Sequence, residues 1–210
     1  MKIKYLGHSS FYIEANKSVV TDPFHNIGYE MERVSADYCL ISHSHFDHNA
    51  AEYVKNATVI DGESKTAAGK EISLCAIKTF HDEFKGKRRG ENLVYKFTLD
   101  GVSFCHLGDI GERLNGDFLG KVGGVDVLFV PIGGNYTINE AEAAKYVDGI
   151  KPKLIVPMHY KTAFSNIDID GYENFTSRYK SIIRQEGEFV FDRSSLEDLD
   201  GSVLLFKEFI

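Results

Sequence analysis

The sequence has few cysteines and no long apolar run. Its three cysteines are Cys39, Cys75 and Cys105. They lie in apolar, strand-like segments, and no two have the spacing of a zinc-binding knuckle. Because an odd number of cysteines without a secretory leader is typical of reduced, buried thiols, we expect a cytoplasmic protein. No segment approaches the length that crosses a bilayer, which predicts that the protein has no membrane partner.

An excess of basic residues is also missing. The chain has 24 Lys and Arg residues against 31 Asp and Glu residues, a formal net charge of -7. A surface that binds nucleic acid usually carries a basic face, so we expect no nucleic-acid partner. The acidic balance does not exclude a small anionic substrate, because a bound metal ion can dominate the field around it.

Strands dominate the first part of the 210-residue chain, and helices enter later. Short β-type runs predict strands over residues 3–7, 10–14, 19–21, 37–42, 71–80, 92–99, 102–107 and 125–130. The later segments predict helices over residues 139–150 and 172–185, and strands over residues 153–156, 189–191 and 203–206. We interpret this order as two stacked sheets with helices outside, in a single domain over residues 1–210. An open α+β sheet is the alternative.

Local signals mark three of the boundaries. Asp100-Gly101 is a two-residue hairpin signal between two predicted strands. Asn139, followed by Glu140, is a candidate N-cap for the first helix. Residues 49–55 are compatible with one or two helical turns after the strand that ends at Ser42.

The densest group of ligand-type residues follows that strand. Four of the six residues from His43 to His48 are histidine or aspartate. His43 and His45 are two residues apart, so in extended backbone both imidazoles lie on one side and can converge on one ion. Asp47 and His48 follow where the chain turns, and they can reach a second position beside the first. A solvated polar loop is the alternative, and the density of ligands favours a metal site.

The pattern His43-x-His45-x-Asp47-His48 resembles the metal motif of the metallo-β-lactamase superfamily without departure. Four more segments resemble that family's site segments, in the family's order: Val20-Thr21-Asp22-Pro23-Phe24, Phe80-His81-Asp82, His106-Leu107-Gly108-Asp109 and Pro157-Met158-His159-Tyr160. Gly7-His8-Ser9-Ser10, the segment from Pro131 to Tyr136 and the segment from Pro157 to Tyr160 look most like the ascorbate-6-phosphate lactonase-like group of metal-dependent hydrolases. The resemblance implies an α+β fold, a four-layer αββα sandwich with its site at one edge of the two sheets.

The resemblance also implies two divalent metal ions per chain. One ion would be bound by His43, His45 and His81. The other would be bound by Asp47, His48 and His159. Asp109 would bridge the two ions. Imidazole and carboxylate ligands suit zinc, manganese or iron, and we expect zinc. A hydroxide that bridges two such ions exists at neutral pH, because metal binding lowers the pKa of water to about 7. The expected catalytic residues are Asp47, Asp109 and His8.

The sequence allows more than one role for the residues around this set. Asp22 is expected to orient a ligand histidine through a ring N–H, or else to close a turn before Pro23. Asp82 is expected either to orient a ligand histidine in the same way or to be an exposed loop carboxylate. His106 is expected in the core or as a residue that orients a ligand. His8 is interpreted as an acid or as a hydrogen-bond donor to an anion in the pocket, with an ordinary turn histidine as the alternative. His25 is expected on the surface.

Three residues are candidates for binding the substrate. The Gly133-Gly134 pair can turn sharply and present Asn135 or Tyr136 to the pocket, unless it is a plain connecting loop. Lys161 lies two residues after His159 and can attract an anion. The basic run at residues 85–90 is either a solvated loop or a cover over the site that favours phosphate or carboxylate groups.

These observations predict a metal-dependent hydrolase. With two carboxylates and one hydroxide, two divalent ions leave a net charge of about +1 around the metals, which favours an anionic substrate. We therefore predict cleavage of an ester, lactone or phosphodiester in a small anionic metabolite. The alternatives are a nuclease-type phosphodiesterase and an iron-dependent redox or sensing protein of the same fold.

Overall fold

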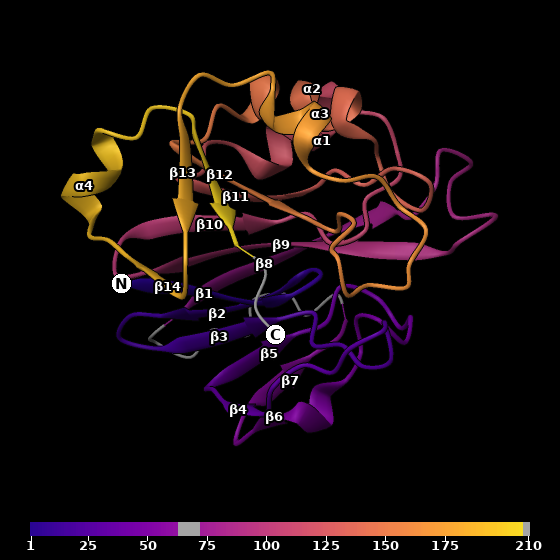
Figure 1. The fold of residues 1–210 in the computed structure, drawn as a ribbon, viewed down its shortest axis with the longest axis horizontal. Coiled ribbons are helices and arrows are strands. Elements are labelled where there is room, and N and C mark those ends of the chain that lie inside the picture. The colour runs from indigo at the N-terminus through magenta and orange to yellow at the C-terminus, as the bar shows by residue number, and fades with distance from the viewer. Residues whose placement is uncertain (63–71, 208–210) are drawn as a thin grey trace.

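Two β-sheets lie face to face in the computed structural model, which describes residues 1–62 and 72–207 (Figure 1). The first sheet has, in spatial order, β14 (Glu188–Val190), β1 (Lys2–Gly7), β2 (Ser10–Glu14), β3 (Ser18–Thr21), β5 (Tyr38–Leu40) and β7 (Thr58–Ile60). The second has β13 (Ile182–Gln185), β15 (Ser202–Phe206), β12 (Leu154–Met158), β11 (Val127–Pro131), β10 (Val102–His106), β9 (Glu91–Leu99) and β8 (Ser73–Phe80). A separate short pair joins β4 (Val34–Ser35) to β6 (Val54–Lys55).

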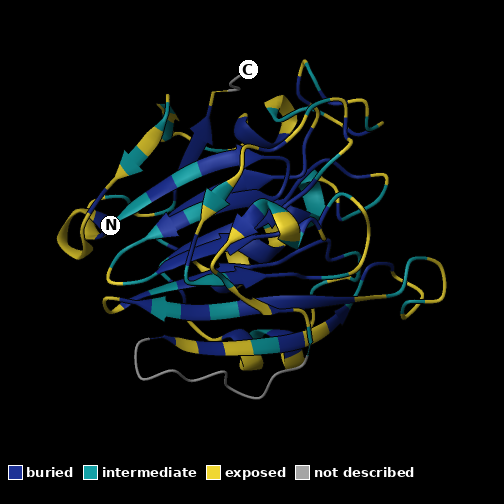
Figure 2. Cartoon of the chain, turned by 90° about the horizontal axis from the view of Figure 1, so that it is seen from below, coloured by how far each residue is buried: buried dark blue, intermediate teal, exposed yellow. Residues whose placement is uncertain are grey.

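The main core fills the space between the two sheets. Phe11 of the first sheet and Tyr95 and Phe129 of the second belong to one cluster of fully buried side chains. Strands β11 and β12 are buried along their whole length, which explains their continuous apolar sequences. Figure 2 shows the buried residues gathered in the middle of the molecule, with the exposed ones mostly at its periphery. The sandwich therefore holds the strand ends on a rigid, close-packed base.

Helices cover the outer face of the second sheet (Figure 1): α1 (Gly116–Val122), α2 (Glu140–Ile150) and α3 (Glu173–Thr176). Helix α2 starts where predicted, since the Asn139 side chain accepts a hydrogen bond from the Glu142 N–H at 2.9 Å. The outer face of the first sheet is covered differently. Phe24, Ile27 and Met31 pack on it together with a short 3-10 turn, η1 (Ala51–Tyr53). Helix α4 (Arg193–Glu197) precedes β15.

Several details differ from the sequence predictions. The helix predicted over residues 172–185 is wrong beyond Thr176, because Ile182–Gln185 pairs with β15 as a strand. Pairing at the sheet edge outweighs local propensity there. Helices α1 and α4 were not predicted. Cys75 is exposed on the edge strand β8, whereas buried thiols were predicted. The start of the predicted strand at Glu71 lies outside the described residues.

The strand directions bring one set of strand ends to a common edge. Strands β3 and β5 run parallel, as do β10, β11 and β12. Strand β8 runs the same way as β10, because each is antiparallel to β9. At the opposite end of β10, Asp100 and Gly101 both have positive φ, 44° and 75°, and form the predicted hairpin. Within the described part of the chain, no helix has the length and apolarity needed to span a bilayer.

Candidate metal centre

The predicted ligands come together just beyond these strand ends. The segments that follow β1, β3, β5, β8, β10 and β12 carry, in that order, His8, Asp22, His43, His81, Asp109 and His159. Three groups have ligand atoms that all lie within 4.8 Å of one another: the first is His43, His45 and His81, the second is His8, Asp47, His48 and His159, and the third is His43, His48 and Asp109. These groups contain the two ligand trios implied by the family resemblance, and the second has His8 in addition.

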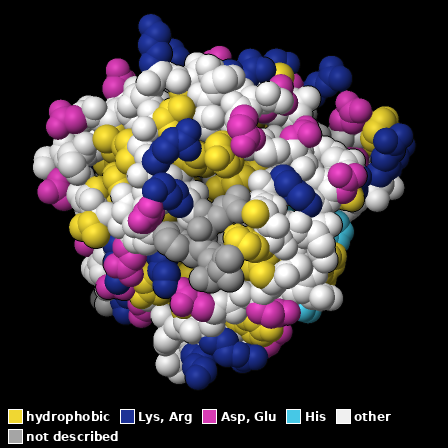
Figure 3. All heavy atoms as spheres, in the orientation of Figure 1, with side chains coloured by type: hydrophobic (Ala, Val, Ile, Leu, Met, Phe, Trp, Pro, Cys, Tyr) yellow, Lys and Arg dark blue, Asp and Glu magenta, His cyan; other side chains and the backbone are white. Residues whose placement is uncertain are grey.

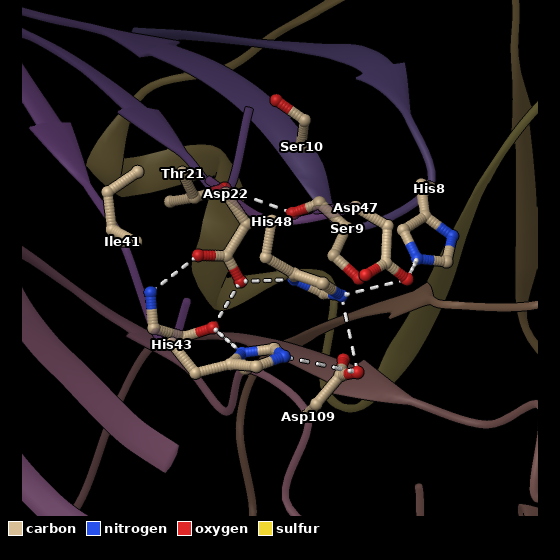
Figure 4. Close-up of polar contacts among 12 residues, drawn as sticks. His8, Ser9, Ser10, Thr21, Asp22, Ile41, His43, Asp47, His48 and Asp109 are labelled. Atoms are coloured by element: carbon tan, nitrogen blue, oxygen red, sulfur yellow. Dashed lines mark hydrogen bonds and ion pairs between the residues drawn. The ribbon is translucent and has the colours of Figure 1, made fainter. Parts of the chain in front are cut away.

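Asp109 lies between the first two of these groups. Its Oδ2 atom is 3.2 Å from the Nε2 atoms of His48, His81 and His159, and 3.9 Å from Nε2 of His43. Figure 4 shows it beside His43 and His48. Its backbone N–H donates to Oδ1 of Asn92 at 2.8 Å, which fixes the position of the residue. The structure thus places Asp109 where a bridging ligand was predicted.

The donor atoms of this cluster fit divalent metal ions. Within the described residues, His43 Nε2 and Asp109 Oδ1 are buried and have no hydrogen-bond partner. Such orphaned atoms are costly unless another group, here a cation, satisfies them. Burial lowers the pKa of His43 to about 3, so its ring is neutral and its lone pair is available. Imidazole nitrogens with carboxylate oxygens are ligands that suit zinc, manganese and iron.

The electrostatics of the protein groups also favour a cation here. Burial disfavours a charge on His48, but the Asp109 and Asp22 carboxylates outweigh it and raise the pKa of His48 well above its usual value. Burial likewise opposes ionisation of Asp109, yet its histidine neighbours, His159 first, hold its pKa well below the ordinary range. The buried carboxylates therefore attract positive charge, whether a proton or a metal ion supplies it.

Asp22 and Ser42 orient two of the predicted ligands. Asp22 Oδ2 accepts from His48 Nδ1 at 2.9 Å (Figure 4). It also accepts from the Ser42 hydroxyl at 2.7 Å. The Ser42 hydroxyl in turn accepts from His43 Nδ1 at 2.9 Å. Because each Nδ1 donates, the neutral form of each ring, which is the form that binds a metal ion, has its Nε2 lone pair facing the cluster. Ser42 was missed in the sequence, although its place directly before His43 was a usable signal.

His8 lies behind Asp47, and it does not line the cavity of the cluster. Its ring is 1% exposed, and its Nε2 atom is 3.4 Å from Asp47 Oδ2. Burial lowers the pKa of His8 to about 4, so the ring is neutral at pH 7. His8, Asp22 and His159 all have positive φ, between 37° and 53°. Backbone strain of this kind concentrates at functional sites.

Two other residues hold the frame of the site. His106 Nε2 lies 2.9 Å from the Ser9 carbonyl, to which it donates, and Nδ1 accepts from the Gly108 N–H at 3.2 Å. His106 therefore ties the turn after β1 to β10, and it lies 3.9 Å from Asp22 Oδ2. Asp82 is buried and accepts four backbone hydrogen bonds from its own loop, so it is neither an exposed carboxylate nor bonded to a ligand histidine. His25 is half-buried outside the cluster.

A cavity of about 440 Å³ opens above the cluster. Tyr136 and Arg89 are on its wall, and Arg89 belongs to the basic run that was predicted either as a solvated loop or as a cover over the site. Lys161 and Asn135 do not line it. The Lys161 ammonium donates to the carbonyls of Ser165 and Ile167, each at 2.7 Å, and so closes its own loop. Asn135 is exposed, and its side chain donates to the Asp168 carbonyl at 2.8 Å.

Comparison with known proteins agrees with this geometry. The profile of the β-lactamase superfamily domain matches residues 2–159. A UPF0173 metal-dependent hydrolase from Archaeoglobus fulgidus is 32% identical over 195 residues, covering 77% of this chain and 84% of that protein. A Thermotoga maritima structure, described as a proposed Zn-dependent hydrolase of the metallo-β-lactamase superfamily, matches with a TM-score of 0.82 and 33% identity, over 98% of this chain and 97% of the other. The predicted α+β sandwich of this type is confirmed, while the narrower lactonase-like grouping stays a prediction. The chain belongs to the metallo-β-lactamase superfamily.

Proposed function

We propose that the protein is a cytoplasmic hydrolase that uses two divalent metal ions, zinc foremost, to cleave an ester, lactone or phosphodiester bond in a small anionic metabolite. One observation carries the proposal: the side chains of His43, His48, His81 and His159 surround Asp109 at the base of a cavity. The relatives named above are metal-dependent hydrolases, which supports the reaction class.

The chemistry divides between the ions and the chain. Bound divalent ions would lower the pKa of water to about 7 and polarise the scissile oxygen. The chain holds the ligands in place beforehand, since Asp22 and Ser42 fix the tautomers of His48 and His43. Neutral His8 packs behind Asp47, with its Nε2 atom 3.4 Å from Asp47 Oδ2, and so limits where that carboxylate can move. Tyr136, on the cavity wall, is placed to donate a hydrogen bond or a proton to a leaving oxygen.

The size of the cavity and the surface charge favour a small substrate. A cavity of about 440 Å³ lies within the range that small-molecule sites occupy. On the face shown in Figure 3, basic and acidic side chains alternate among the described residues, without a basic stripe of the kind that follows a nucleic-acid backbone. Both features support a metabolite as the partner over a polymer or a membrane.

A metal analysis combined with a substrate panel tests the proposal. The protein is stripped with a chelator, reloaded separately with Zn, Mn or Fe, and assayed on matched esters, lactones and phosphodiesters. We expect about two ions per chain and metal-restored hydrolysis of anionic small molecules. Cleavage confined to long RNA or DNA would indicate a nuclease, and oxygen consumption without hydrolysis would indicate a redox protein. Either result would contradict the proposal.

A further inference from the structure

Arg89 is the one lysine or arginine among the described residues that line the cavity of the metal cluster. Five predicted metal ligands line the same cavity, including His81 and Asp109. A guanidinium group on this wall is close enough to contact a substrate whose scissile bond lies at the cluster. Arginine is suited to this task because its planar fork matches carboxylate and phosphate oxygens.

The side chain of Arg89 is held in place by its neighbours. Its guanidinium carbon lies 4.6 Å from the ring centroid of Tyr136, a cation–π distance. One of its N–H groups donates to the Asn135 carbonyl at 3.3 Å. An arginine has five N–H donors, so this one contact leaves others for a ligand. Within residues 1–62 and 72–207, no carboxylate lies within ion-pair distance, 4.0 Å, of the Arg89 guanidinium.

The backbone of Arg89 is fixed by the buried carboxylate of Asp82. Oδ1 accepts the N–H groups of Phe84 and Gly86 at 2.8 and 3.0 Å. Oδ2 accepts those of Arg88 and Arg89, each at 2.8 Å. Asp82 directly follows His81, whose own N–H donates to the Gly90 carbonyl at 3.1 Å. The backbone of the loop is thus hydrogen-bonded around one carboxylate, and the loop begins at a predicted metal ligand, His81.

Three other cations near this loop do not line the cavity of the metal cluster. Arg88 stacks on Phe84 at 3.9 Å and lines a second cavity, of about 740 Å³, which shares His81, Arg89 and Tyr136 with the first. Arg113 pairs with Glu83 at 3.4 Å, and Lys145 pairs with Glu142 at 2.7 Å. Arg89 therefore differs from these neighbours in its position, because it lines the cavity that the predicted metal ligands share.

We propose that Arg89 binds a carboxylate or phosphate group of the substrate that is separate from the scissile bond, and that Asp82 is the residue that positions it. This inference deepens the proposed function and rests on it for the identity of the reaction. It makes Arg89 a determinant of specificity: substrates with an anionic group beside the scissile bond bind more tightly than neutral substrates of the same shape.

Binding of inorganic phosphate and of acetate to the metal-loaded protein, followed by calorimetry, tests the proposal without turnover. Arg89→Ala should weaken binding of at least one of the two anions about 10–100-fold, because a hydrogen bond to a charged group contributes about 1.5–3 kcal/mol. The anion affected tells which oxyanion the site prefers. Arg88→Ala is the matched control and should change binding less than about twofold, in line with its place outside the cavity. Equal binding by wild type and Arg89→Ala, or equal losses in the two variants, would overturn the proposal.

A kinetic comparison separates this inference from the proposed function. The substrates are 4-nitrophenyl hemisuccinate, which carries a carboxylate, and the neutral 4-nitrophenyl butyrate. Arg89→Ala and Asp82→Asn should raise KM for the charged ester alone, with kcat and metal content kept, and Arg89→Lys should recover part of the loss. A KM that rises equally for both esters would contradict a role in specificity. If the wild type cleaves neither ester and no other member of the panel, the proposed function fails, and the phosphate and acetate measurements still decide the role of Arg89.

Discussion

The two sheets hold their predicted metal ligands in different ways. On the first sheet, His43 and His48 have their Nδ1 atoms hydrogen-bonded through Ser42 and Asp22. On the second sheet, the Nδ1 atoms of His81 and His159 are buried and have no hydrogen-bond partner within the described residues. Their positions are set instead by close backbone packing. A Cβ atom at Gly111 would lie 2.5 Å from the carbonyl oxygen of His81. A Cβ atom at Gly133 would overlap the carbonyl oxygen of His159.

This difference separates two means of preparing a metal site. A carboxylate behind a ligand selects the ring tautomer and increases the basicity of the ligand, so it acts on metal affinity directly. Close packing fixes only where the ring lies, so it acts through the stability and shape of the fold. We expect substitutions on the first sheet to change affinity more than stability, and substitutions on the second to do the reverse.

Asp109→Asn should have the largest effect, because Asp109 faces ligands from both sheets. The amide removes the negative charge that four imidazoles surround. We expect metal affinity to fall by more than about 100-fold, beyond the 10–100-fold typical of residues that only orient ligands. Metal content after dialysis at defined free zinc measures this, with Asp168→Asn, an exposed carboxylate on the same cavity, as control. Two ions retained at wild-type affinity would show that Asp109 is not a ligand.

Asp22→Asn should break the first-sheet arrangement. An amide nitrogen in place of Oδ2 cannot accept from His48 and Ser42, so the tautomers of His48 and His43 are no longer fixed. Metal affinity should fall about 10–100-fold, as measured by competition with a chelator. Asp126→Asn is a matched control, since Asp126 also accepts from a serine N–H and hydroxyl, those of Ser103, but lies away from the cluster. Similar affinity losses in both variants would mean that the effect is general destabilisation.

The sequence revealed the first-sheet ligands more directly than those of the second sheet. His43, His45, Asp47 and His48 are neighbours in the chain, and spacing alone indicated that they can converge. The placements of His81, Asp109 and His159 came only from the family resemblance, because residues that meet across strand ends have no local signature.

Contacts formed only in the folded chain were not predictable. Lys161 was a reasonable anion-binding candidate beside His159, but two carbonyls of its own loop bind its ammonium group. The position of Arg89 depends on which backbone amides Asp82 collects, and composition does not encode that. The same limit applies to residues 182–185, which form a strand because β15 offers them a partner.

Gly133→Ala should break the second-sheet arrangement with a smaller effect on affinity. The added methyl group forces the backbone at His159 to shift, and overpacking of this kind costs about 1–3 kcal/mol. For a domain of this size that lowers Tm by roughly 3–10 °C. Calorimetry of the metal-free protein measures it. Gly120→Ala is the control, since its Cβ meets nothing within 4 Å, and it should be neutral or stabilising. A loss of metal affinity equal to that of Asp22→Asn, without a change in Tm, would contradict the comparison.

The smallest effect is expected at the contact between Asp126 and Ser103, which lies away from the metal cluster. Burial raises the pKa of Asp126, but hydrogen bonds from Ser103 and the nearby Lys153 outweigh it and lower the pKa below its ordinary value. A depressed carboxylate pKa contributes stability above the unfolded-state value, near 3.9, and that contribution is lost as pH falls through the folded-state value. Asp126→Asn should therefore lower the free energy of unfolding by about 1–2 kcal/mol at pH 7, with the gap to wild type narrowing in acid. Urea unfolding at pH 7 and pH 3 measures both gaps, and a gap that is unchanged between them would show that the contact does not depend on the carboxylate charge.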